Sequence, residues 1–196
     1  MKNVLFTIIA LLITASSQAQ VLSTADTLGK SKNLLAVSEN NLEDAGVGIN
    51  IAYLQYIRGV SPNFDLYLSV GQTDLFDESQ QWIGLGWNAH LLSVKGVSVS
   101  FYTNTTIPLS NSQIGSAVLV NPAIVVSHSV NSRLTFYIGV NALVPIGSQS
   151  SRFFTPMTTK VNVPIGASIV FGNWGLVEEV DLGKLKAVGV ALSRTF

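Results

Sequence analysis

The last stretch of the chain, from Lys184 to Phe196, reads KLKAVGVALSRTF. In this stretch Val188, Val190 and Leu192 alternate with small or weakly polar residues, and the chain ends on an aromatic side chain. Successive side chains of a β-strand point to opposite faces, so the alternation gives one apolar face and one face of small residues. The stretch therefore predicts an amphipathic β-strand at the C-terminus.

The same period-two alternation recurs along the chain from Gly46 onward, in segments of about 10 to 14 residues, the length of barrel strands. Tight turns are predicted between some of these segments, at 61–63, 93–96, 131–132 and 172–173. Longer polar loops are predicted between the others, at 40–45, 72–80, 108–115 and 147–159. Short turns on one side and longer loops on the other are typical of a transmembrane β-barrel, whose short turns face the periplasm.

Nine strands can be identified in this way, and single-chain bacterial barrels have an even number of strands. The segment from Gly29 to Ser38 is therefore predicted to be a first, upward strand. The predicted fold is an all-β, antiparallel, up-and-down transmembrane barrel over residues 29–196, with about ten strands, or eight if two short segments do not span. Pro122 lies inside one predicted strand and predicts a bulge there, because proline cannot donate a ladder hydrogen bond.

The composition supports a membrane barrel over a soluble β-sandwich. Charged residues make up 11% of the chain, against about 25% in soluble domains. No Asp, Glu, Lys or Arg occurs in residues 96–132, 134–151 or 161–177, although the solvent face of a sandwich would carry such residues. The net charge of zero argues against nucleic acid as a partner, and the absence of cysteine excludes disulfides and thiolate chemistry.

The N-terminus has the pattern of a secretory signal peptide. A positive start at Lys2 precedes an apolar run from Val4 to Ile13, and Ser17-Gln18-Ala19 is a small-residue cleavage pattern. The apolar run is too short for a membrane anchor, which needs roughly 20 residues. The predicted organisation is a signal peptide over residues 1–19, an N-terminal periplasmic segment over 20–28, and the barrel.

The closing strand resembles the C-terminal strand of bacterial outer-membrane β-barrels, as the whole pattern resembles the porin-like barrels of Gram-negative bacteria. In those families a terminal aromatic residue, here Phe196, and alternate apolar residues act as an assembly signal. The chain departs from the pattern at Arg194, where an apolar or aromatic residue is usual. The resemblance implies location in the cell outer membrane, contact with outer-membrane lipid, and recognition of the C-terminal strand by the barrel-assembly machinery.

Several aromatic residues fall next to the predicted periplasmic turns or at the C-terminus. Aromatic side chains gather at membrane interfaces, where their amphipathic rings meet the headgroups. The predicted periplasmic aromatic girdle consists of Phe64, Phe136, Phe171, Trp174 and Phe196.

Eight-stranded barrels are filled by side chains, and open aqueous channels need roughly 16 strands. Ten strands therefore favour a narrow porin-like channel for small solutes, with a non-conducting structural or adhesion barrel as the alternative. The predicted lumen-lining residues are Arg58, Asp65, Asn88, His90, Tyr102, Asn104, Tyr137, Asn141, Lys160, Glu179 and Asp181. The glycines expected to leave room beside them are Gly48, Gly71, Gly84, Gly86, Gly139, Gly166 and Gly189.

In the adhesion alternative, a partner would bind to extracellular loops. The longest predicted loop carries Arg152, Phe153 and Phe154, which are predicted to form either a contact surface for a partner or part of the outer aromatic girdle.

Enzyme activity is the third alternative, because some outer-membrane barrels are envelope hydrolases that use His. His90 is predicted to point inward near a periplasmic turn, and His128 to lie on the lipid face. Neither position brings a base to a nucleophile at the outer rim, where such sites lie. The chain is therefore predicted not to be an enzyme and to have no cofactor and no metal site.

Overall fold

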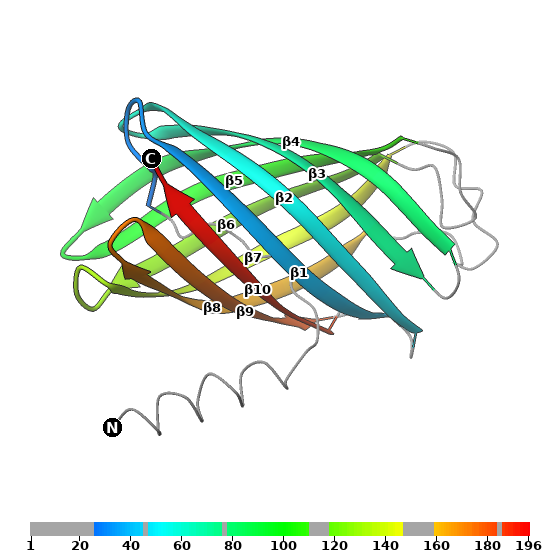
Figure 1. The fold of residues 1–196 in the computed structure, drawn as a ribbon. Helices are drawn as coiled ribbons and strands as arrows, with labels where there is room; N and C mark the ends of the chain where they lie inside the picture. The colour runs from blue at the N-terminus through cyan, green and yellow to red at the C-terminus, as the bar shows by residue number, and fades with distance from the viewer. Residues whose placement is uncertain (1–25, 45–46, 76–77, 110–117, 147–158, 184–185) are drawn as a thin grey trace, which may run out of the picture.

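The computed structural model describes residues 26–44, 47–75, 78–109, 118–146, 159–183 and 186–196. These residues form ten antiparallel strands that close into a barrel (Figure 1). The strands are β1 (Asn33–Asp44), β2 (Val47–Ser61), β3 (Phe64–Leu75), β4 (Glu78–Val94), β5 (Val97–Pro108), β6 (Val118–Ser129), β7 (Leu134–Ile146), β8 (Lys160–Phe171), β9 (Trp174–Gly183) and β10 (Lys186–Thr195). The described part of the chain contains no helix that is long and apolar enough to cross a membrane.

The barrel closes where β10 returns to β1. The two strands pair from Leu34–Thr195 to Glu43–Lys186 without a shift of register. The terminal Phe196 extends the pairing, because its N–H donates to the Asn33 carbonyl oxygen over 2.9 Å and its own carbonyl accepts the Asn33 N–H over 3.0 Å. A closed sheet leaves no edge strand with unpaired backbone groups, which is what a sheet in lipid requires. The predicted closed antiparallel barrel of ten strands is confirmed.

Side chains alternate between an inner face, which carries most of the polar residues and several aromatic rings, and an apolar outer face. In β10, Ala191 and Ser193 are buried inside the barrel, while Val190 and Leu192 are exposed outside. The same division runs through β3 and the strands that follow it, where the residues predicted to face lipid form the outer surface. Exposed Leu, Ile and Val thus cover the outside, as in the apolar band of a transmembrane barrel.

In β2 the prediction is wrong, because its faces are the reverse of those expected. Tyr53 and Ile57 point inward and are buried, whereas Gly48 and Asn50 are exposed outside. Both faces of this strand carry apolar residues, so the alternation alone does not determine which face is inside. The register with β3 determines it, since Ile57 lies opposite the inward-facing Tyr67.

Two bulges lie near the tight-turn end of the barrel, one in β2 between Gly59 and Ser61 and one in β4 between His90 and Leu92. The β4 bulge leaves both Leu91 and Leu92 exposed outside. The bulge predicted at Pro122 is not present, because the β5–β6 pairing runs through this residue without a register shift.

The predicted loops at 40–45 and 72–80 are mostly strand, because β1 continues to Asp44, β3 to Leu75, and β4 begins at Glu78. At 72–80 the polar residues that suggested a loop instead contact one another, within β3 and across to β4. Asp74 Oδ1 accepts hydrogen bonds from Gln72 Nε2 over 2.9 Å and from Ser79 Oγ over 2.5 Å. A polar sequence at this end of the barrel therefore extends the strands instead of ending them.

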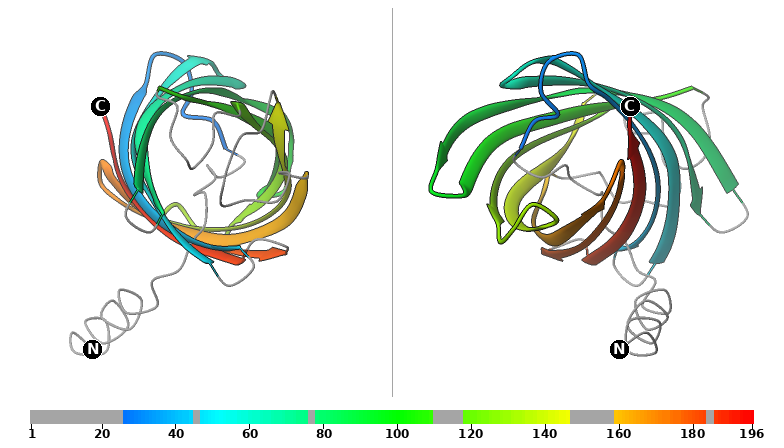
Figure 2. Two further views of the ribbon diagram at one scale, coloured as in Figure 1. Left: turned by 90° about the vertical axis from the view of Figure 1, so that its right-hand side faces the viewer. Right: turned by 60° about the vertical axis from the view of Figure 1, so that its left-hand side comes forward.

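The tight turns between β2 and β3, β4 and β5, β6 and β7, and β8 and β9 lie at one end of the barrel, together with the C-terminus (Figures 1 and 2). The β4–β5 turn consists of Lys95 and Gly96, both with positive φ (49° and 80°), as a two-residue hairpin requires. Residues 26–32 lie at this same end, which we call the turn end.

Candidate functional site: the barrel interior

The inner face of the barrel is rich in polar side chains, and every strand contributes at least one. Three of the buried polar residues carry a charge when ionised, and all three are carboxylic acids: Asp65, Glu179 and Asp181. The buried polar residues in the described part of the chain are Ser38, Asn40, Gln55, Asp65, Ser69, Gln80, Asn88, Ser98, Ser100, Asn104, Asn121, Ser127, Asn141, Asn162, Ser168, Glu179, Asp181 and Ser193.

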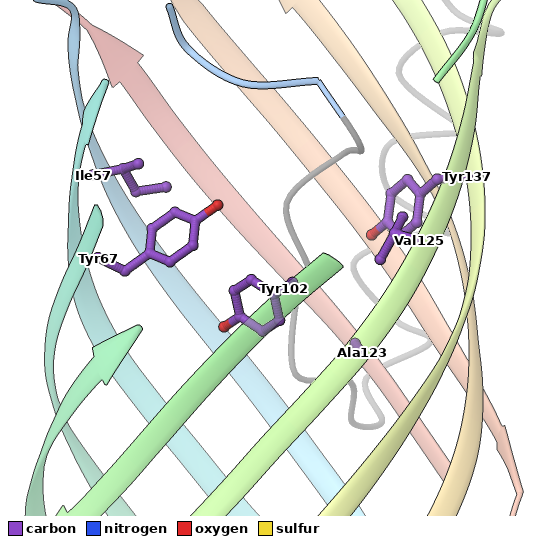
Figure 3. Close-up of a cluster of buried hydrophobic side chains, with 6 residues drawn as sticks. All are labelled: Ile57, Tyr67, Tyr102, Ala123, Val125 and Tyr137. Atoms are coloured by element: carbon purple, nitrogen blue, oxygen red, sulfur yellow. The ribbon is translucent and has the colours of Figure 1, made fainter. Parts of the chain in front are cut away.

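Tyrosine rings from three strands project into the interior (Figure 3). Tyr67, Tyr102 and Tyr137 are each 3% exposed, and they pack with Ile57 and Val125. The ring centroids of Tyr67 and Tyr102 lie 5.4 Å apart. The rings fill part of the cross-section, so the interior is not an open tube.

The Tyr137 hydroxyl donates a hydrogen bond of 2.7 Å to Oε2 of Glu179. This contact joins β7 to β9 across the intervening strand β8. It passes over Gly166 of β8, which lies directly opposite Tyr137 in the β7–β8 pairing and opposite Glu179 in the β8–β9 pairing. A single buried hydrogen bond therefore joins side chains of β7 and β9 over the backbone of β8.

Two inward glycines are covered by aromatic rings and do not leave free space, contrary to expectation. Gly166 lies opposite Tyr137, and Gly71 lies opposite Trp82. A Cβ added at either glycine would overlap the ring of its partner. Gly48 was also expected to leave room inside, but it lies on the outer face.

Many of the buried polar atoms have no protein hydrogen-bond partner among the described residues. Among them are the side-chain amides of Asn40 and Asn88, the Ser100 hydroxyl and one carboxyl oxygen of Asp181. Burying a polar group without a partner costs about 1–3 kcal/mol, so native proteins satisfy such groups with protein or with ordered water. The inner face thus has the chemistry of a hydrated surface.

Four asparagines form a continuous band on the inner face of β5 to β8. Asn104 lies directly opposite Asn121, and Asn141 lies directly opposite Asn162. Asn121 and Asn141 come from neighbouring strands and are offset by one inward position. All four are at most 4% exposed. Neutral amides offer both donors and acceptors, so the band can bind water or a small polar solute without preferring one charge.

Eight of the predicted lumen-lining residues are buried inside the barrel: Asp65, Asn88, Tyr102, Asn104, Tyr137, Asn141, Glu179 and Asp181. Two more, His90 and Lys160, are half-buried and lie on the inward-facing side of their strands.

Arg58 does not lie in the interior. It is exposed on the outer face, where Nη1 donates to the side-chain oxygen of Asn33 over 3.0 Å. The prediction for Arg58 is wrong for the same reason as for the rest of β2, whose faces are the reverse of those expected.

The predicted girdle residues lie on the outer surface close to the turn end. Phe64 stacks on Trp87 with a centroid distance of 5.9 Å, and Trp87 contacts Phe101 at 5.3 Å. Phe136, Phe171, Trp174 and Phe196 are exposed, and the Arg194 guanidinium lies over the Trp174 ring at 5.4 Å. The predicted contact residues Arg152, Phe153 and Phe154 lie outside the described residues, as does the predicted signal peptide.

The two histidines lie on different faces of the barrel wall. His128 is exposed outside, with Nδ1 3.2 Å from the Gly96 carbonyl oxygen, whereas His90 is half-buried on the inward side. They do not come together into one site. Within the described residues, no group of three or more His, Cys, Asp or Glu side chains is arranged to hold a metal ion.

The predicted lumen-lining set omitted other inward positions that the structure buries, among them Tyr67, Trp82, Asn121, Asn162 and the serines on β3, β5 and β6. Tyr67 could have been found, because it alternates with the clearly apolar Leu66 and Leu68. The covering of Gly71 by Trp82 depends on strand register, which the sequence alone does not specify.

The fold defines the class of protein: a closed, ten-stranded antiparallel barrel of the transmembrane type. No family model and no curated protein matches the chain. Among solved structures, the barrel is similar to an outer membrane channel from Pseudomonas putida F1, with a TM-score of 0.58 and 9% identity over 89% of this chain and 99% of that chain. The KdgM porin is a more distant match, with a TM-score of 0.46 and 9% identity over 82% of this chain and 99% of that chain.

Proposed function

We propose that the chain is an outer-membrane barrel whose interior forms a narrow, hydrated, porin-like passage for small polar solutes. The observation that carries the proposal is the inner face itself, where buried amide, hydroxyl and carboxyl groups lack protein partners among the described residues. A barrel that served only as a structural support would be more stable with an apolar or fully hydrogen-bonded interior. The tyrosine rings narrow the passage and restrict it to small solutes.

Conductance of the purified chain in planar lipid bilayers tests this proposal. We expect small, discrete current steps, well below those of a general-diffusion porin, because ten strands and the interior tyrosines leave a narrow path. A bilayer that stays sealed at high protein load, with the protein in its closed, heat-modifiable form, would overturn the proposal.

The passage is expected to favour cations over anions, because the buried ionisable groups on its wall are carboxylic acids. We expect the double variant Glu179→Gln and Asp181→Asn to lower the cation-to-anion permeability ratio severalfold, as measured by reversal potentials in a salt gradient. Both changes keep the size of the side chain and remove only its capacity for charge.

The matched control for this variant is Glu39→Gln, which removes a carboxylate that is exposed on the outer face of β1. We expect this change to leave the permeability ratio as in the unmodified chain. Equal ratios for the interior variant and the unmodified chain would place Glu179 and Asp181 away from the ion path.

A further inference from the structure

Residues 26–32, which we call the strap, precede β1 and cross the turn end of the barrel (Figures 2 and 3). The sequence predicted a periplasmic segment up to residue 28 and a first strand from Gly29, but β1 begins at Asn33. The strap instead makes contacts with inward-facing side chains of the barrel. It is therefore part of the interior and not a free leader before it.

One end of the strap is hydrogen-bonded to the backbone of β2. The Ser31 N–H donates to the Gly59 carbonyl over 2.8 Å, and the Gly59 N–H donates to the Lys32 carbonyl over 2.9 Å. Gly29 and Ser31 have positive φ (84° and 66°), which turns the chain sharply toward the barrel axis. Gly59 permits this approach, because a Cβ at its position would overlap the Gly29 carbonyl oxygen.

The middle of the strap lies over β3. The Leu28 N–H donates to both carboxyl oxygens of Asp65, over 3.0 and 3.3 Å, and Asp65 is 2% exposed. The Leu28 side chain packs against the buried cluster that contains Tyr67. Thr27 Oγ1 donates to the Pro62 carbonyl oxygen over 2.5 Å.

The far end of the strap reaches β5, where the Ser98 hydroxyl donates to the Asp26 carboxylate over 2.6 Å. In the ten-stranded circle β5 lies four strands from β1. The strap leads into β1 and accepts a hydrogen bond from Ser98 of β5. It therefore crosses most of the width of the barrel at the turn end. The strap is held by a few hydrogen bonds and by one apolar side chain, Leu28, so displacing it costs far less than opening any strand pair of the barrel.

We infer that the strap is an internal plug that limits access of small solutes to the barrel interior from the turn end. This inference rests on the proposed function, since it assigns to the strap the control of access to that same passage. The plug packs against the interior cluster through Leu28, and its hydrogen bonds extend from β2 to β5. Displacing it widens the turn end, whereas the barrel wall stays closed.

The chain contains no cysteine, so a single cysteine introduced inside the barrel reports access without background. Ser100 is 1% exposed and lies one inward position beyond Ser98 on β5. We would measure the rate at which Ser100→Cys reacts with a small, water-soluble methanethiosulfonate reagent. The strap is displaced by Gly59→Ala, whose methyl group would occupy the position of the Gly29 carbonyl.

The matched control is Gly48→Ala, the same substitution in the same strand at a position with open space around the new methyl group. We expect Gly59→Ala to raise the reaction rate at least severalfold and Gly48→Ala to leave it unchanged. Equal rates in the two variants, each with the gel shift of a closed barrel, would overturn the inference.

A second variant covers the case in which Gly59→Ala fails to form a closed barrel. Asp26→Ala combined with Leu28→Pro changes the strap alone, because alanine removes the acceptor for Ser98 and proline removes the donor to Asp65. The same rise in labelling rate is expected, and an unchanged rate would count against the plug.

Labelling does not require current to flow, so it separates the two proposals. Faster labelling of the strap variants in a barrel that never conducts would support the plug and reject the channel. Conductance that is identical with and without the strap, together with unchanged labelling, would support the channel and reject the plug.

Discussion

Ile138→Arg is expected to destabilise the barrel by up to about 2–4 kcal/mol, the cost of a cationic side chain on the lipid face at the bilayer midplane. Ile138 lies on the outer face of β7 and is 48% exposed. Its neighbours across the two strand pairs are Val126 and Ile165, both exposed and apolar. No partner for a charge faces this position on either neighbouring strand.

This cost corresponds to a drop of roughly 30- to 1,000-fold in the ratio of folded to unfolded protein, at about 1.4 kcal/mol per factor of ten. It is measured by urea titration in lipid vesicles, in which the heat-modifiable band reports the closed barrel. Ile138→Leu keeps the surface apolar and is expected to unfold at the same urea concentration as the unmodified chain. Equal midpoints for the Arg and Leu variants would show that this face does not contact lipid.

Gly166→Val is expected to have the second largest effect, about 1–3 kcal/mol of destabilisation from overpacking. A Cβ at Gly166 would overlap Cζ and Oη of Tyr137 and lie 2.6 Å from the Glu178 carbonyl oxygen. The Tyr137 ring must then move, and its 2.7 Å hydrogen bond to Glu179 is lost.

Two further variants identify the cause of the Gly166→Val effect. Tyr137→Phe removes the hydroxyl but keeps the ring, so it measures the hydrogen bond to Glu179 by itself. Tyr137→Ala placed in the Gly166→Val background removes the ring that the valine would displace. We expect the double variant to be more stable than the sum of the single changes predicts, since the two sites contact each other. Simple additivity of the unfolding free energies would show that ring displacement is not the cause.

Much of the barrel was predictable, because alternation along a strand is a local property. The closing strand shows this most directly, since Val190 and Leu192 lie outside while Ala191 and Ser193 lie inside, as the sequence indicated. The even strand number was predictable because a chain that starts and ends in the same compartment must cross the membrane an even number of times. Two of the tight turns were also local, because Gly96 and Gly172 supply the positive φ that short hairpins need.

The candidate site was less predictable. Asp65, Glu179 and Asp181 were expected inside from alternation, and the structure buries all three. Arg58 was expected inside and lies outside, because β2 carries apolar residues on both faces. Where both faces of a strand resemble each other, the pattern contains no information about direction, and pairing with a neighbouring strand decides it.

The sequence by itself determined that this chain forms amphipathic strands, in what order they follow, and that their outer surface is apolar. Only the tertiary structure decided which side chains meet across the interior: Tyr137 with Glu179 over Gly166, and the strap with Asp65 and Ser98. Those contacts join residues that are 37 to 72 positions apart in the chain. Such contacts depend on closure and register, which are properties of the whole sheet, whereas alternation is a property of each strand alone.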